Sequence, residues 1–240
     1  MTGAIRTGRV VTALLLGLGS VAAAACSDSV GTDTTPTSAP CSPQAPGPAR
    51  IAPTTVVPLD GTGDRTIGLP GQLPLPLLVH AHHDGADSFV VSGVDASSKA
   101  TQVFASTLGK YDGTFAVGFV DACATPTAAL HIATKGAWHL DFANAKLAPQ
   151  YENAKGVAGR GDAVLSYLGG STQVRIAYSG TQSKEPSLRS HDAFAVTTYG
   201  AKGPSLLAQS NGAYHGTVVL PRGPVFIAVT AHGPWTIARA

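Results

Sequence analysis

Four histidines are the residues whose type and spacing most plainly suggest chemistry. His80 and His82 are separated by one residue in a His-Ala-His-His run, and alternate residues of a strand lie on one face about 7 Å apart. Imidazoles at this spacing can ligate Zn²⁺ or Cu²⁺. His131, His139 or Asp84 are candidates to complete such a site. The competing interpretation is four solvated histidines on a neutral surface.

The strands that carry these histidines are predicted from the alternation of apolar residues. Over 77–82 the alternate residues Leu77, Val79 and Ala81 are apolar and are expected to face the core, so His80 and His82 are expected to point outward. The same parity turns His131 and His139 outward from their own strands. A three-residue loop between those two strands would place His131 directly opposite His139.

Sequence signatures of catalysis are missing. The chain has no G-x-S-x-G elbow, no H-E-x-x-H motif and no glycine loop of the Walker or Rossmann type. Its aspartates are scattered over expected turns without pairing. We therefore expect that the protein is not an enzyme and needs no cofactor beyond the Zn or Cu ion considered above.

The composition predicts an all-β protein. Charged residues make up 12% of the chain, and 28 glycines and 17 prolines accompany abundant Val, Thr and Ser. This balance disfavours helices and favours short strands with frequent turns. Seven or so antiparallel strands per domain would form a β-sandwich of the jelly-roll or Ig-like kind.

Four short motifs occur twice in the same order, with offsets of 97–105 residues. This predicts two tandem sandwiches, at 59–144 and 158–240, joined by a linker at 145–157. Residues shared by both copies are expected to serve the fold, with aspartates in turns, tyrosines near strand corners and tryptophans in the cores: Asp64, Tyr111, Trp138, Asp162, Tyr214 and Trp235. The tripeptide 160–162 reads Arg-Gly-Asp, but its counterpart at 62–64 reads Thr-Gly-Asp, which indicates a turn rather than an adhesive motif.

The first 26 residues have the pattern of an export signal. Arg6 and Arg9 precede an apolar run over 10–25, which ends in three alanines and Cys26. This pattern resembles the lipobox of bacterial lipoproteins. The resemblance implies cleavage of residues 1–25, acylation of Cys26 by chains such as palmitate, and a lipid-anchored protein on the extracytoplasmic side of the cell membrane. Ordinary secretory cleavage is the alternative.

Residues 26–58 are expected to form a disordered tether. Fifteen of residues 27–50 are Ser, Thr, Pro or Gly, a composition that cannot bury enough apolar surface to fold. Cys41 and Cys123 are left as a candidate disulfide outside the cytoplasm. Without the signal, 16 − 2 = 14 basic residues balance 14 acidic ones, and a neutral chain gives no indication of nucleic-acid binding.

These observations predict a non-catalytic, membrane-anchored ectodomain that binds a protein, glycan or other component of the cell envelope. The alternative is a Zn- or Cu-binding lipoprotein that uses the histidines of the first domain.

Overall fold

The computed structural model describes residues 56–119, 125–181 and 192–240, all within one compact unit, Cys41–Ala240. The signal at 1–25, Cys26, nearly all of the tether and the candidate disulfide of Cys41 with Cys123 lie outside these ranges. Within them there is no helix of the length and hydropathy needed to cross a membrane.

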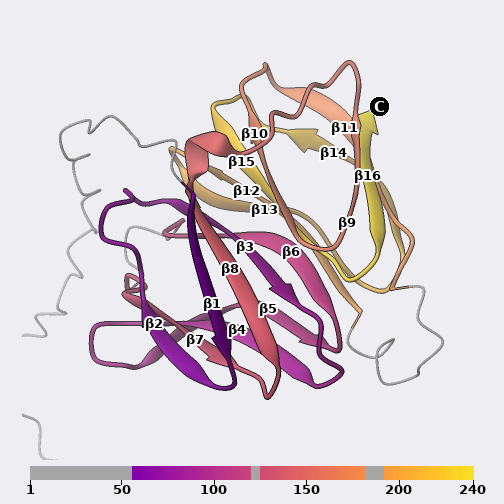
Figure 1. The fold of residues 1–240 in the computed structure, drawn as a ribbon. Helices are drawn as coiled ribbons and strands as arrows, with labels where there is room; N and C mark the ends of the chain where they lie inside the picture. The colour runs from indigo at the N-terminus through magenta and orange to yellow at the C-terminus, as the bar shows by residue number, and fades with distance from the viewer. Residues whose placement is uncertain (1–55, 120–124, 182–191) are drawn as a thin grey trace, which may run out of the picture. The chain divides into compact units, whose positions relative to one another are not determined.

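The described residues form four antiparallel sheets of four strands each, which make two sandwiches (Figure 1). In the first sandwich, the sheet β1-β8-β3-β6 lies over β2-β7-β4-β5. Its strands are β1 (Val57–Thr62), β2 (Arg65–Gly68), β3 (Leu77–His83), β4 (Ser88–Val94), β5 (Ala100–Leu108), β6 (Tyr111–Val117), β7 (Ala129–Ala133) and β8 (Ala137–Asn144).

The second sandwich pairs the sheet β9-β16-β11-β14 with β10-β15-β12-β13. Its strands are β9 (Val157–Arg160), β10 (Ala163–Tyr167), β11 (Thr172–Tyr178), β12 (Ala193–Gly200), β13 (Gly203–Asn211), β14 (Tyr214–Leu220), β15 (Val225–Thr230) and β16 (Pro234–Arg239). The short 3₁₀ turn η1 (Ala145–Leu147) lies between the sandwiches in the sequence.

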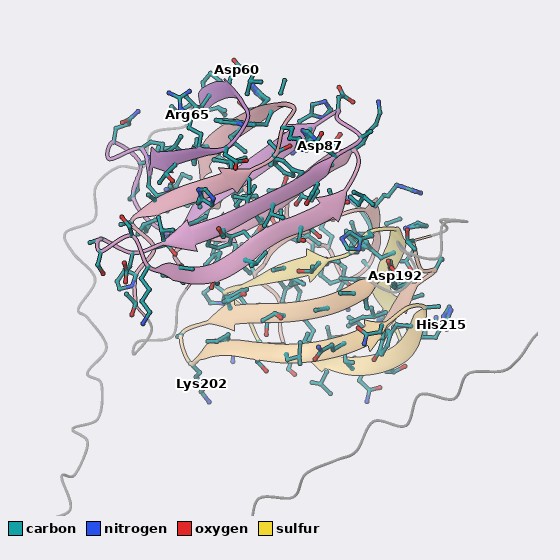
Figure 2. All side chains as sticks on the ribbon, turned by 90° about the horizontal axis from the view of Figure 1, so that it is seen from below. Asp60, Arg65, Asp87, Asp192, Lys202 and His215 are labelled. Atoms are coloured by element: carbon teal, nitrogen blue, oxygen red, sulfur yellow. The ribbon has the colours of Figure 1, made fainter. Side chains whose placement is uncertain are left out.

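The strand order is the same in both sandwiches and is that of a jelly roll. This confirms the predicted all-β fold and the tandem arrangement, with eight strands in each sandwich instead of about seven. Figure 2 shows Asp60, Arg65 and Asp87 on the first sandwich and Asp192, Lys202 and His215 on the second.

Each sandwich has its own apolar core, built from strands whose residues alternate between buried and more accessible positions. In β4, Phe89 and Val91 are fully buried, and in β12 Phe194 and Val196 are equally enclosed. Side chains of a strand point alternately to its two faces, so these β-branched and aromatic residues fill the space between the sheets.

A tryptophan in each core holds the turn that precedes the second strand. Trp138 Nε1 donates to the Gly63 carbonyl at 3.0 Å, and Trp235 Nε1 donates to the Gly161 carbonyl at 2.8 Å. Both indoles are 3% exposed. Because a buried indole N–H needs a partner, this bond ties the turn to the core.

The aspartate of each turn accepts a backbone N–H. Asp64 Oδ1 accepts from Thr134 N at 2.8 Å, and Asp162 Oδ1 accepts from Ala231 N at 2.8 Å. Gly161 between Arg160 and Asp162 has φ +73°, which only glycine adopts readily. The Arg-Gly-Asp tripeptide therefore forms a turn whose aspartate is 8% exposed and points into the protein.

Candidate functional site

Three of the four candidate histidines lie on one face. His80 and His82 are on β3 and His139 is on β8, and the Cα atoms of His82 and His139 are directly paired. His131 is on β7 in the opposite sheet, where Nδ1 lies 3.1 Å from the Thr66 hydroxyl. The expected opposition of His131 and His139 is wrong, because the turn at 134–136 carries the chain from one sheet to the other.

Each histidine of this face lies beside a carboxylate. His80 Nε2 is 3.4 Å from Asp112, and His82 Nε2 is 2.9 Å from Asp84. His139 lies 2.7 Å from Asp60 and 3.2 Å from Asp141.

The carboxylates beside His139 favour its protonated form, and the described residues do not form the expected metal site. The hydrogen bond to Asp60, followed by the charge of Asp141, raises the pKa of His139. Across the described ranges, no three or more His, Cys, Asp or Glu side chains are grouped so that they can hold a metal ion. The geometry therefore provides no site of the kind expected from His80, His82, His131 and His139.

A fifth histidine, His83, is fully buried, although the sequence analysis gave it no role. Its ring stacks on Phe89 at 4.9 Å, and Nδ1 donates to the Ala137 carbonyl at 2.8 Å. Nε2 lies 3.4 Å from Asp87, whose pKa is lowered to about 2 by hydrogen bonds from Lys135 N and Thr134. The strand parity that turns His80 and His82 outward also turns residue 83 inward, so the sequence contained this signal.

The two sandwiches meet through an apolar contact at one end of the β1-β8-β3-β6 sheet. Leu78 and Val164 are buried there, and the Phe119 ring packs at 4.9 Å from Tyr199 and 4.8 Å from Phe226. Removing these rings from water stabilises the contact.

A buried hydrogen bond lies beside this apolar contact. The Tyr111 hydroxyl donates to Asp162 Oδ2 at 2.6 Å, and Thr114 N donates to the Asp162 carbonyl at 2.9 Å. Burial raises the pKa of both Tyr111 and Asp162, most strongly that of the tyrosine. Tyr111 was predicted to lie near a strand corner and to serve the fold of its own domain, whereas the structure pairs its hydroxyl with a carboxyl group of the second sandwich.

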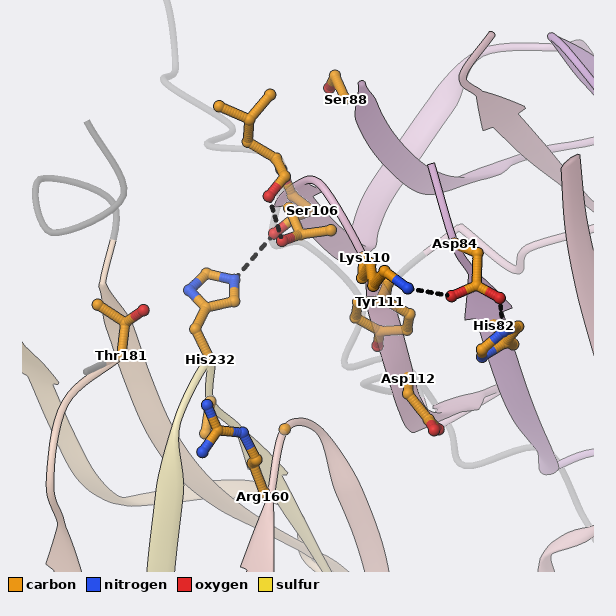
Figure 3. Close-up of a pocket in the computed structure, with 14 residues that line it drawn as sticks. His82, Asp84, Ser88, Ser106, Lys110, Tyr111, Asp112, Arg160, Thr181 and His232 are labelled. Atoms are coloured by element: carbon orange, nitrogen blue, oxygen red, sulfur yellow. Dashed lines mark hydrogen bonds and ion pairs between the residues drawn. The ribbon is translucent and has the colours of Figure 1, made fainter. Parts of the chain in front are cut away.

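Next to this bond the two sandwiches enclose an open cleft of about 850 Å³ (Figure 3). Strands and turns of the first sandwich form one wall, and three chain segments of the second sandwich form the other. The residues are His82, Asp84, Ser88, Ser106, Thr107, Leu108, Lys110, Tyr111 and Asp112 on the first wall, and Arg160, Gly161, Thr181, Ala231 and His232 on the second.

Contacts within and across the cleft hold several of its polar side chains. His232 Nε2 reaches across to the Ser106 carbonyl at 2.9 Å. Asp84 accepts from Lys110 at 3.0 Å and contacts His82 at 2.9 Å. The hydrogen bond with His82, followed by the hydrogen bond and the charge of Lys110, lowers the pKa of Asp84. The cleft therefore combines apolar surface with polar side chains that are held by hydrogen bonds.

The cleft joins residues 82–112 to residues 160–232. His82 and Asp84 of the first wall were predicted as metal ligands, and nothing in the sequence brought the two walls together. One signal was present in the sequence, since residues 180–191 of the second domain have no counterpart in the first, and long loops of this kind suit ligand contact. Thr181 is the only lining residue of that loop within the described ranges; residues 182–191 lie outside them.

Comparison with known proteins assigns this chain to no family. No family model matches the sequence, and no curated protein matches it significantly. A conserved protein of unknown function from Pseudomonas aeruginosa PAO1 is 14% identical, with 76% of each chain covered and a TM-score of 0.23.

Two further solved structures show a comparable likeness. The CUB1-EGF-CUB2 domain of human MASP-1/3 is 8% identical over 77% of this chain and 99% of that chain, with a TM-score of 0.24. A triple jelly roll protein of an archaeal virus turret is 11% identical over 78% of this chain and 51% of that chain, with a TM-score of 0.24. At this level of similarity, the chain's function has to be argued from its own site.

Proposed function

We propose that the protein is a lipid-anchored, extracytoplasmic binding protein that holds a polar component of the cell envelope in the cleft between its two sandwiches, without catalysis. The cleft is the observation that carries the proposal. Its volume of about 850 Å³ lies within the usual range of ligand sites, about 300–1,000 Å³.

The position of the cleft supports a binding role. Turns at the end of a rigid β-sandwich are a common place for ligand contact, because the sheets hold the backbone while the turn residues vary. Arg160 and His232 lie at turns of the second sandwich, and Lys110 lies at the turn between β5 and β6. The lining serines Ser88 and Ser106 have no side-chain hydrogen bond to a histidine among the described residues, so neither has the partner that an activated nucleophile needs.

Filling the cleft is expected to abolish ligand binding. Ser88→Trp places a large ring at an exposed lining position, whereas Gln102→Trp places the same ring at an exposed position of the same sheet outside the cleft. Co-sedimentation with purified cell-wall material should show binding by the wild-type protein and by Gln102→Trp. Ser88→Trp should bind at least about tenfold more weakly than the wild-type protein, as expected when a packed contact is blocked. Equal binding by all three proteins would place the binding surface elsewhere.

The lipid anchor has its own test. In cells fed an alkyne analogue of palmitate, the wild-type protein is expected to be labelled, because the sequence around Cys26 resembles a lipobox. Cys26→Ser should lose the label and be released from the membrane, since acyl chains would supply its membrane affinity. Cys41→Ser is the matched control and should keep the label; an unlabelled wild-type protein would contradict the anchor.

A further inference from the structure

Arg160 is a cation of the cleft to which the described residues offer no charged partner. It is the last residue of β9, its side chain is exposed, and it lines the cleft beside His232 (Figure 3). No ion pair of Arg160 is found among the described residues. An arginine presents a planar fork of donors that matches a carboxylate or phosphate in two parallel hydrogen bonds.

The acidic side chains that the structure describes around the cleft are already engaged. Asp84 is held by Lys110 and His82, and Asp112 lies 3.4 Å from His80. Asp162 is buried and accepts from Tyr111. Among the described residues, the other charged side chains of the cleft are therefore paired. The Arg160 guanidinium remains available to an anionic group of a ligand.

The rest of the cleft favours a ligand rich in hydroxyl groups. Hydroxyl side chains line both walls, together with apolar surface that includes the Tyr111 ring, Leu108 and Ala231. The free lone pairs of Asp84 and Asp112 can accept hydrogen bonds from ligand hydroxyls.

The cleft is much larger than a bare anion, so such an ion would fill only a small part of it. A water-sized species takes about 30 Å³, a small part of the roughly 850 Å³ enclosed. An oligosaccharide with an acidic group can fill the space and still reach both walls.

We infer that the cleft binds an acidic saccharide of the uronic-acid type, with its carboxylate on Arg160 and its hydroxyls on the opposite wall. This inference rests on the proposed function and names the ligand class of the same site. Carboxylate-bearing sugars thus become the expected ligands among the components of a cell envelope.

The test uses the full chain purified in detergent and two trisaccharides of the same shape, trigalacturonate and its methyl ester. Calorimetric titration should show binding of the acid that is about tenfold or more tighter than binding of the ester, as expected for charge-assisted hydrogen bonds. Arg160→Gln should lose a similar factor for the acid alone, and Arg160→Lys should recover only part of it. Arg65→Gln removes an exposed arginine of the first sandwich outside the cleft and is the matched control.

Each contrary result overturns the inference in a distinguishable way. Equal binding of the acid and the ester, or equal losses of affinity in Arg160→Gln and Arg65→Gln, would show that Arg160 does not bind the carboxylate. The cleft could then still be a binding site. Displacement of the trisaccharide by sulfate at the same concentration would leave only a bare anion site. Failure of both trisaccharides to bind would exclude this ligand class, and the separate effect of Ser88→Trp on wall binding would then decide whether the proposed function survives.

Discussion

Gly61→Ala is expected to destabilise the first sandwich by about 3 kcal/mol, at the upper end of the cost of overpacking a core. A Cβ atom at this position would lie 2.0 Å from Cζ2 of Trp138 and 2.4 Å from its Cη2. The indole has little room to move, because it is buried and its N–H is bonded to Gly63. Gly159→Ala should act in the same way on the second sandwich, since its Cβ would lie 2.3 Å from Trp235.

Chemical denaturation followed by fluorescence and circular dichroism measures this effect. Gly68→Ala is the matched control, because no atom lies within 4 Å of the added Cβ and the residue is also in a strand. Combining Gly61→Ala with Trp138→Leu should cost less than the sum of the two single changes, because the smaller side chain removes the clash. Additive costs would show that the indole is not what requires glycine at position 61.

Tyr111→Phe is expected to weaken the contact between the sandwiches by about 1–3 kcal/mol, the usual cost of leaving a buried acceptor without its donor. Among the described residues, the change leaves the buried Asp162 carboxyl with the backbone N–H of Ala231 as its remaining hydrogen-bond donor. Asp162→Asn should be tolerated better, because its amide can accept from Ala231 and donate to Tyr111. The double variant Tyr111→Phe/Asp162→Asn should show coupling between the two positions in the free energy of unfolding.

The pH dependence of this pair has a defined sign. Burial raises the pKa of Asp162, so the folded protein binds a proton that the unfolded chain has already released. The stabilising contribution is therefore complete below the unfolded pKa near 3.9 and is lost as the pH rises through the folded value. Between pH 4 and 7 the stability of the wild-type protein should fall relative to that of Asp162→Asn. A rise in the stability of the wild-type protein relative to Asp162→Asn over this pH range would contradict a raised pKa of Asp162.

The sheet face by which the second sandwich contacts the first is apolar, whereas the equivalent sheet face of the first sandwich is polar. The second sandwich presents Val164, Phe226 and Ala228 from β10 and β15 to the first. The topologically equivalent face of the first sandwich carries Thr66 on β2 and His131 on β7, which bond to each other.

The opposite outer surface of the second sandwich is also polar, with Gln173 and Arg175 at the positions that correspond to Leu78 and His80. Polar outer faces limit end-to-end association of modules. The hydrogen bond of His131 with Thr66 is consistent with a place on such a polar outer face.

The sequence by itself determined the local features of this protein. Alternation of apolar residues indicated which side chains of β3 and β8 point outward, because a strand has a period of two in any sheet. The motif Gly-x-Gly-Asp recurs at 61–64 and 159–162, and Gly-x-Trp recurs at 136–138 and 233–235. The first indicated matching turns, because a turn depends on residues close in the chain, and the second indicated buried tryptophans, because of their size. The all-β fold and the tandem sandwiches followed from these patterns.

Only the tertiary structure decided which surfaces meet. Parity shows the side of a strand on which His131 lies, but not the sheet to which the strand belongs, and the turn at 134–136 separated His131 from His139 by crossing between sheets. The Tyr111–Asp162 bond joins residues 51 positions apart in the sequence, and the cleft joins β3 and β6 to turns of the second sandwich. Such contacts depend on the packing of two complete cores against each other, which no local pattern of residues encodes.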